Sequence, residues 1–299
     1  MSSFKDLKQN RMDNLKNLTK QVEKLAEKPS YEDDRIWKPE KDNTGNGYAI
    51  IRFLPAPAGE DVPWVRLWTH GFKGPGGWYI ENSLTTPRSD APSGSKDPVS
   101  VANTALWNSG VESDKDIARQ RKRKLNYYSN VIVVEDPTNP QNNGKVMLFK
   151  YGKRIFDKVY DCLNPEFKDE AKINPFDFYD GVNFKMKVRM VEGYVNYDKS
   201  EFESSAKPIA DTDEEIENIW DKCYSLQDFL GPDNFKSYDE LEAKFFKVLG
   251  DTVDRTSTVE DDVAEAIEYP SATKEETPDI PFETDEKLDY FKALANEDV

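Results

Sequence analysis

Basic and aromatic side chains occur together at three places along this 299-residue sequence. The densest basic run, residues 121–124, leads directly into Tyr127 and Tyr128. A second group occupies 149–154, and a third contains the tyrosines of 194–197. Lysine and arginine bind phosphates and aromatic rings stack on bases of any sequence, so this combination is typical of single-stranded nucleic-acid binding. The alternative is that the tyrosines belong to a core and the basic run is a solvated edge.

The two adjacent tyrosines cannot both point the same way in a regular strand. Successive side chains of a strand alternate between its two faces, so Tyr127 and Tyr128 are expected on opposite faces. At least one of them is therefore expected to belong to the core and to support stability.

Residue types that carry enzyme chemistry are scarce. The single histidine, His70, excludes any site that needs two histidines, and the distant Cys162 and Cys223 exclude a disulfide scaffold or a cysteine-rich zinc module. Neither a phosphate-binding G-x-x-x-x-G-K-[ST] loop nor a G-x-S-x-G motif occurs. The 57 acidic residues make pairs of carboxylates common, so the sequence does not exclude a metal site built from carboxylates alone. A metal-dependent nuclease therefore remains the alternative among enzymes.

Charge is distributed unevenly along the chain. The formal net charge is −16, yet residues 35–154 carry 18 basic against 12 acidic groups, and residues 251–299 carry 4 against 16. A basic segment beside an acidic end indicates an interaction tail, which we expect to be disordered. The longest apolar runs are too short to span a membrane and the first residues lack an apolar signal region, so we expect a cytoplasmic protein with no membrane contact.

Periodicity predicts a mixed β/α fold. Apolar alternation and turn residues predict six strands and five helices. The strands are expected at 48–54, 64–69, 78–80, 122–135, 145–151 and 182–191, and the helices at 4–28, 101–107, 152–163, 214–229 and 238–249. This order favours a five-stranded oligonucleotide-binding β-barrel with inserted loops and flanking helices. The chain then has three parts: an N-terminal helical self-association arm (1–34), the barrel core (35–250, with an insertion at about 82–121) and the acidic tail (251–299).

These residues in their order resemble one family, the replicative single-stranded DNA-binding (helix-destabilising) proteins of T-even-type phages. The resemblance covers about residues 40–250. The stretches that carry it are 43–47 with 51–55, 70–73 with 77–81, 122–124 with 127–128, Asn130 and 133–137, 144–146 with 152–155, and Gly193 with 196–198.

The resemblance implies a non-enzymatic protein that coats single-stranded DNA without sequence preference, melts its secondary structure, and works in DNA replication, recombination and repair. It implies cooperative arrays of the protein on DNA, recruitment of phage replication and recombination proteins through the acidic tail, and the cytoplasm of the infected bacterial host as the location. A regulator that binds single-stranded RNA remains the second interpretation. The DNA-contact candidates are Arg52, Trp107, Lys122, Arg123, Lys124, Tyr127, Tyr128, Phe149, Tyr194 and Tyr197, to which the basic runs add Arg121 and Lys153.

Two departures from the family pattern concern the metal and the N-terminus. The family holds zinc with one histidine and three cysteines, and here His70 is matched by Ser83, Asp97 and Ser100. Serine does not replace a thiolate ligand, so we expect no zinc and no other cofactor. The family's short basic N-terminal segment is replaced by the longer helix candidate at 4–28. In addition, Phe149 stands where the family has tyrosine, which keeps a ring and removes a hydroxyl.

Overall fold

The computed structural model describes residues 33–91, 94–167, 171–191 and 193–250. Contacts divide the chain into two units, Met1–Ile36 and Trp37–Val299, and almost all of the described residues belong to the second unit. The expected helix at 4–28 and the acidic tail at 251–299 lie outside the described residues.

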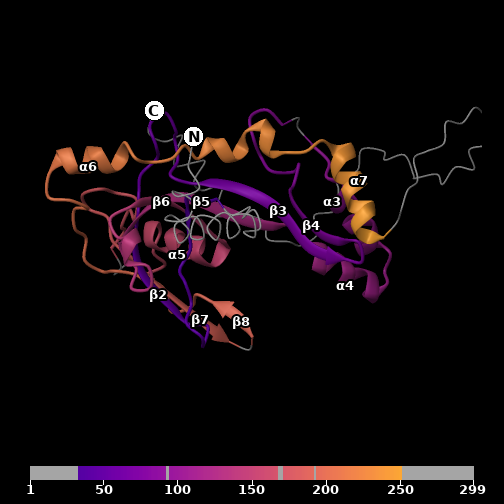
Figure 1. Cartoon of the computed structure of the whole chain (residues 1–299), viewed down its shortest axis with the longest axis horizontal. Coiled ribbons are helices and arrows are strands. Elements are labelled where there is room, and N and C mark those ends of the chain that lie inside the picture. Colours follow the sequence, from indigo (N-terminus) through magenta and orange to yellow (C-terminus); the bar gives the residue numbers. More distant parts are fainter. Residues whose placement is uncertain (1–32, 92–93, 168–170, 192, 251–299) are drawn as a thin grey trace, which may run out of the picture. The chain divides into compact units, whose positions relative to one another are not determined.

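Strands and helices follow one another in a mixed order (Figure 1). The strands are β1 (Ile36–Trp37), β2 (Gly47–Phe53), β3 (Val65–Gly74), β4 (Gly77–Asn82), β5 (Lys124–Glu135), β6 (Val146–Tyr151), β7 (Phe184–Val191), β8 (Tyr194–Asn196) and β9 (Glu201–Phe202). The α-helices are α3 (Pro98–Asn108), α4 (Glu112–Arg121), α5 (Lys153–Leu163), α6 (Asp213–Trp220) and α7 (Tyr238–Leu249), with short 3₁₀ turns η1 (Pro140–Asn142), η2 (Gln227–Leu230) and η3 (Pro232–Asn234).

Strand β5 connects the parts of the sheet. Its first half pairs antiparallel with β3, its second half with β2, and β6 runs along its other edge from Tyr127 to Ile132. Strand β2 continues to β7, which also pairs with β8 and β9, and β3 forms a hairpin with β4. The described strands therefore form one large sheet, which has more strands than the five expected. The pairings among these described strands do not include one that closes the sheet into a barrel.

Two hydrophobic clusters hold these elements. The larger lies between the sheet and α5, where Phe53 is fully buried among the rings of Phe149, Tyr151, Phe176 and Phe184. The smaller joins the β3–β4 hairpin to α3 and α7 through rings such as Phe72, Tyr79 and Phe245. The hairpin, the insertion and the C-terminal helix thus share one small core, beside which β5 begins.

The predicted elements match the structure where apolar periodicity is strong. All six predicted strands are present, and α7 spans the predicted 238–249, begun by a Ser237–Glu240 capping box and ended by Gly250 with a φ of 86°. The helix predicted at 214–229 is wrong in length: α6 ends at Trp220, and η2 follows within the same segment. Helix α4 was not predicted, because its sequence is mostly charged and only Ala118 is buried.

A buried asparagine fixes the segment that follows α6. The Asn130 side chain is fully buried on β5, donates to the Tyr224 carbonyl at 2.8 Å and accepts from the Tyr224 amide at 2.9 Å. This pair of bonds holds the segment that carries Phe229, whose ring stacks on Tyr128 at 4.2 Å.

Replacing Asn130 by alanine should lower the free energy of unfolding by about 2–4 kcal/mol, because two backbone groups lose their partner and a cavity is left. Urea titration measures the change. Asn218→Ala is the control, since that exposed side chain bonds only within its own helix, and it should change stability by no more than about 0.5 kcal/mol. An equal effect of the two substitutions would contradict the role given to Asn130.

Candidate nucleic-acid interface

The cationic run (residues 121–124) joins the end of α4 to the start of β5. Arg121 is the last residue of α4, Lys122 and Arg123 follow, and Lys124 begins the strand. Lys124 is exposed and the other three are half-buried. Both neighbouring elements are anchored, so the run is held at a fixed place beside β3.

The basic side chains of the run have different surroundings. The Arg121 guanidinium lies over the rings of Phe72 and Phe245, 5.8 and 5.7 Å from their centres, and burial lowers its pKa. Arg123 lies 4.3 Å over the Trp68 ring and donates to the Thr85 hydroxyl. Arg121 is thus turned toward a small core, whereas Arg123 lies over the Trp68 ring next to Lys124.

Trp68 is a residue that the sequence did not single out as a contact candidate. It lies on β3, opposite Leu125 of β5, and is half-buried. The alternation of Trp64, Arg66 and Trp68 was visible in the sequence, but the pairing of β3 with the start of β5 was not.

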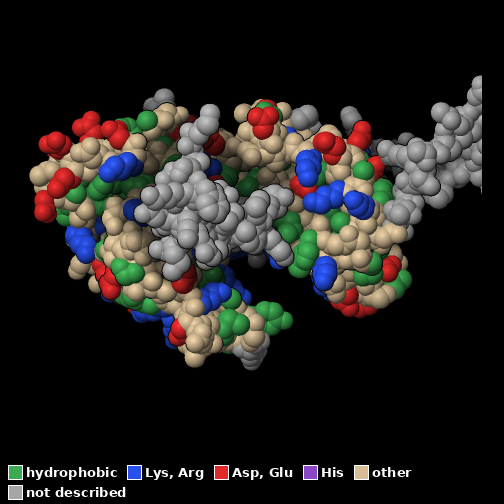
Figure 2. Space-filling model, in the orientation of Figure 1, with side chains coloured by type: hydrophobic (Ala, Val, Ile, Leu, Met, Phe, Trp, Pro, Cys, Tyr) green, Lys and Arg blue, Asp and Glu red, His purple; other side chains and the backbone are tan. Residues whose placement is uncertain are grey.

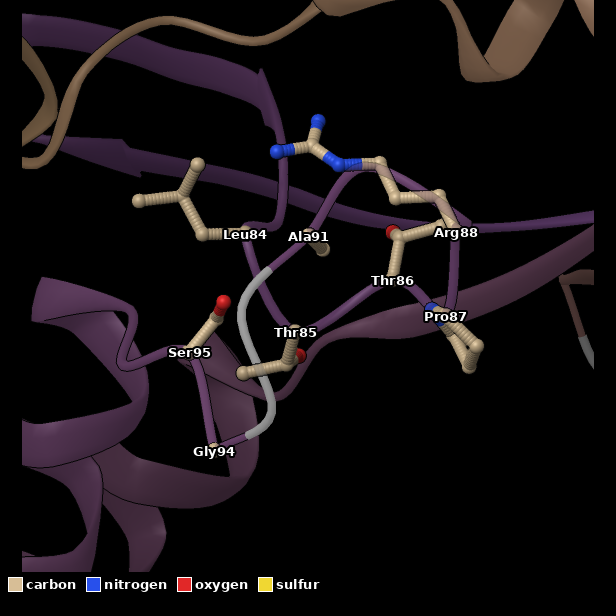
Figure 3. A pocket seen from close by; sticks show the side chains of 8 residues that line it. All are labelled: Leu84, Thr85, Thr86, Pro87, Arg88, Ala91, Gly94 and Ser95. Atoms are coloured by element: carbon tan, nitrogen blue, oxygen red, sulfur yellow. The ribbon is translucent and has the colours of Figure 1, made fainter.

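A hollow of about 340 Å³ lies next to Thr85 (Figure 3). Its wall comes from the loop after β4 and the approach to α3: Leu84, Thr85, Thr86, Pro87, Arg88, Ala91, Gly94 and Ser95. The Arg88 guanidinium lies 3.8 Å over the Phe235 ring and contacts Asp90 at 3.3 Å, and in Figure 3 it extends along one edge of the loop. The Arg88 side chain therefore ties this loop to the segment just before α7, where Phe235 lies.

Tyr127 and Tyr128 point to opposite faces of β5, and both are buried, with 1% and 5% of their surface exposed. Tyr127 stacks on Phe156 of α5 at 4.0 Å with an angle of 8° between the rings. Tyr128 stacks on Phe229, and the Lys150 ammonium lies 5.7 Å over its ring. The expectation that at least one tyrosine belongs to the core is confirmed, and in this conformation neither presents a free face to a base.

Arg52 and Phe149 were also candidates, and the structure places both inside the protein. Phe149 packs among Trp37, Phe53 and Tyr151. Arg52 is 1% exposed, and its guanidinium donates to the carbonyls of Asp177 and Lys207 at 2.9 and 3.0 Å. The loops that contain Asp177 and Lys207 cover the side of β2 on which the Arg52 side chain lies. Arg52 therefore ties these loops to the strand.

The remaining candidates lie nearer the surface. Tyr194 at the start of β8 is 78% exposed, and Tyr197 is half-buried, which raises the pKa of its hydroxyl. Trp107 of α3 is half-buried with the Arg119 guanidinium 5.3 Å from its ring, and Lys153 contacts Asp157 at 3.1 Å. The structure therefore gathers the cationic run with Trp68 at one place, and holds Tyr194 on the separate β7–β8 hairpin.

Basic residues on the outer face of β7 are neutralised by nearby acids. Lys185 contacts Glu203 at 3.3 Å, Lys187 contacts Glu201 at 2.7 Å, and Arg189 pairs with Asp198. Acidic side chains also gather over α6, at the end of the unit away from α4 (Figures 1 and 2). The cationic run is thus set apart from the acidic side chains of α6.

His70 and Asp97 form a buried cluster behind the cationic run. The side chains of His70 and Asp97 are 1% and 0% exposed, and Nε2 of His70 lies 3.1 Å from Oδ1 of Asp97. Nδ1 of His70 lies 3.0 Å from the carbonyl oxygen of Arg121. The Asp97 carboxylate caps α3 by accepting from the amides of Val99 and Ser100.

The second oxygen of Asp97 is also occupied. Oδ2 accepts from the Ser83 hydroxyl at 3.0 Å and from the Leu84 amide at 3.2 Å. Burial by itself raises the pKa of Asp97, but the contact with His70 and the bonds from Ser100 and Ser83 outweigh it, and the pKa falls below its ordinary value. The carboxylate is therefore held in its charged form.

These residues do not fit a zinc ion. Ser83 and Asp97 stand with Ser100 where the resemblance places thiolates, and both oxygens of Asp97 already serve protein donors. In the described part of the chain, no group of three or more His, Cys, Asp or Glu side chains is arranged to hold a metal ion. Across the same residues, no helix has both the length and the apolar character that crossing a membrane requires.

Comparison with known proteins agrees with the resemblance seen in the sequence. A family model described as "gp32 DNA binding protein like" matches residues 45–249. A "Single-stranded DNA-binding protein" of Enterobacteria phage T2 is 37% identical over 238 residues, which cover 78% of this chain and 77% of that protein. The identically named protein of Enterobacteria phage T4 is 36% identical over 226 residues, 75% of this chain and 73% of its own. The chain therefore belongs to the gp32-like family of DNA-binding proteins.

Proposed function

We propose that this protein binds single-stranded DNA without sequence preference and without catalysing a reaction, coating exposed strands in phage DNA replication, recombination and repair. The observation that carries the proposal is the cationic run, whose Arg123 lies over the Trp68 ring. The relatives of this chain from phages T2 and T4 are named single-stranded DNA-binding proteins. Its location would be the cytoplasm of the infected bacterial host.

The architecture supports a binding surface of the oligonucleotide-binding barrel type. Strand β5 pairs with β3 and β2 at its two ends, which is a pairing that a small barrel uses, and we propose that the sheet closes in this way. The DNA phosphates would contact Lys122, Arg123 and Lys124, and the bases would stack near Trp68 and on Tyr194. Arg121, Arg52, Phe149, Tyr127 and Tyr128 would act through the core in the conformation described, and Trp107, Lys153 and Tyr197 would border the path.

The parts outside the described residues complete the proposal. Residues 1–34 would join neighbouring copies on DNA, and the acidic segment 251–299, with its 16 acidic groups, would recruit phage replication and recombination proteins. The second interpretation, single-stranded RNA binding with translational regulation, uses the same surface and is separated by competition between DNA and RNA oligonucleotides.

Changing both Lys122 and Arg123 to alanine should weaken binding to a single-stranded oligonucleotide and flatten its salt dependence. Each phosphate that is no longer neutralised should reduce the slope of log K against log salt by about 0.7. A fluorescence anisotropy titration at several salt concentrations measures this slope.

The matched control removes two cations that already have acidic partners, Lys185→Ala with Lys187→Ala, and should leave the slope close to that of the unaltered protein. Equal slopes for both pairs would remove the cationic run from the interface. Cleavage of the oligonucleotide on addition of Mg²⁺ would favour a nuclease instead.

Replacing Tyr194 by alanine should weaken binding by about 1–3 kcal/mol, because a stacked base loses its ring. Tyr194→Phe should restore affinity, and neither change should lower the melting temperature, because the side chain is 78% exposed. Tyr127→Ala should instead lower the free energy of unfolding by about 3–5 kcal/mol through the loss of a buried ring. A Tyr194→Ala protein that binds as tightly as the unaltered one would exclude a stacking role.

We also propose that the protein needs no metal or other cofactor. Metal analysis of the purified protein should find no stoichiometric zinc, and a chelator should not change the melting temperature. One tightly held zinc per chain would show that other residues act as ligands.

A further inference from the structure

We propose that His70, as an imidazolium ion, forms a metal-free clamp with Asp97 that positions the cationic run (residues 121–124) for nucleic acid. The positioning part rests on the proposed function, whereas the charge state of the ring does not. This pair connects β3 and the start of α3 to the end of α4 through buried groups at short distances.

The charge state follows from what each ring nitrogen faces. A backbone carbonyl can only accept, so Nδ1, 3.0 Å from the Arg121 oxygen, must carry a proton. In a neutral ring the unprotonated Nε2 would then lie 3.1 Å from the Asp97 carboxylate, buried and without a hydrogen-bond partner among the described residues. Four donors, from Ser83, Leu84, Val99 and Ser100, hold that carboxylate charged. A proton on Nε2 gives that nitrogen the carboxylate as its partner, and the pair becomes a buried ion pair of zero net charge.

The other groups packed against the ring keep this balance. The Tyr79 ring lies edge-on at 6.3 Å from the His70 ring, and burial raises the pKa of its hydroxyl, so it stays neutral. The Arg121 guanidinium lies over the rings of Phe72 and Phe245. The Asp97 carboxylate is thus the anion that the His70 ring contacts.

The clamp joins three elements that carry the interface. His70 belongs to β3, Asp97 caps α3, and the Arg121 carbonyl ends α4. The next three residues are Lys122, Arg123 and Lys124, so the bond to the Arg121 carbonyl sets where the run enters β5. Arg123 is fixed to the same insertion a second time through Thr85, whose hydroxyl lies 2.9 Å from that of Ser83.

The charge state can be measured without ambiguity, because His70 is the single histidine of the chain. In protein labelled with ¹⁵N-histidine, both ring nitrogens of the folded, unaltered chain should give signals of the protonated type. Asp97→Asn keeps the capping oxygen but removes the charge, and should convert one of the two nitrogens to the unprotonated type. One unprotonated ring nitrogen in the unaltered folded protein would overturn the clamp whatever the protein binds.

Positioning is tested by substitutions that keep one contact of the ring at a time. The amide nitrogen introduced by His70→Asn can replace Nδ1 and bond the Arg121 carbonyl, whereas that introduced by His70→Gln replaces Nε2 and faces Asp97. Binding to a thymidine oligonucleotide is titrated with salt at a temperature where each variant is folded. His70→Gln should flatten the slope of log K against log salt by about 0.7 for each phosphate that the displaced run no longer reaches, and His70→Asn should retain more of the slope.

Thr104→Ala is the control, since it removes a hydrogen bond to the Ser100 carbonyl inside α3, leaves the amide that Ser100 donates to Asp97 in place, and should leave the slope as it is. A His70→Gln protein that is folded and shows the unaltered slope would overturn the positioning role, even if its melting temperature falls. If the unaltered protein did not bind the oligonucleotide at all, the proposed function would be contradicted. The ¹⁵N signals of His70 would still test the charge state of the ring.

Discussion

The pairing of β5 with three other strands is the constraint on which the rest of this structure depends. Its second half, paired with β2, lies in the main core, and its first residue belongs to the cationic run. A strand buried on both faces, as β5 is at residues 127–131, cannot shift its register by one residue without exchanging the side chains on its two faces. The position of Lys124 relative to Trp68 and Thr69 of β3 is therefore set by the packing of Val131 and Val133, several residues away.

This arrangement separates the residues that hold the surface from those that form it. Tyr127, Tyr128, Phe149 and Arg52 are in the interior, where they join β5, β6 and β2 to α5 and to the outer loops. The surface itself needs few groups: flexible cations for phosphates and some exposed ring for bases. The acids beside β7 are paired and those of α6 lie at the other end of the unit, so neither group opposes an anion at the cationic run, although the whole chain carries a net charge of −16.

Sequence reasoning succeeded where one local pattern determines the outcome. The capped, periodic α7 and the alternating strands are examples, and so is the opposite orientation of Tyr127 and Tyr128. It failed where burial depends on distant segments. Nothing near Arg52 in the sequence indicates that the carbonyls of Asp177 and Lys207 would enclose it, and the charged sequence of α4 gives little sign of a helix. The absence of thiolates at 83, 97 and 100 could be seen in the sequence, but the four bonds that Asp97 accepts were visible only in three dimensions.

The central claim is that single-stranded DNA lies along the cationic run beside Trp68. Ultraviolet cross-linking of the full-length protein to a thymidine oligonucleotide, followed by mass spectrometry of the joined peptides, tests it most directly. We predict cross-links in the peptide containing Trp68 and in that containing Tyr194, both suppressed by excess unlabelled single strand and by high salt. Cross-links confined to the acidic 213–250 region, with neither of those peptides modified, would contradict it.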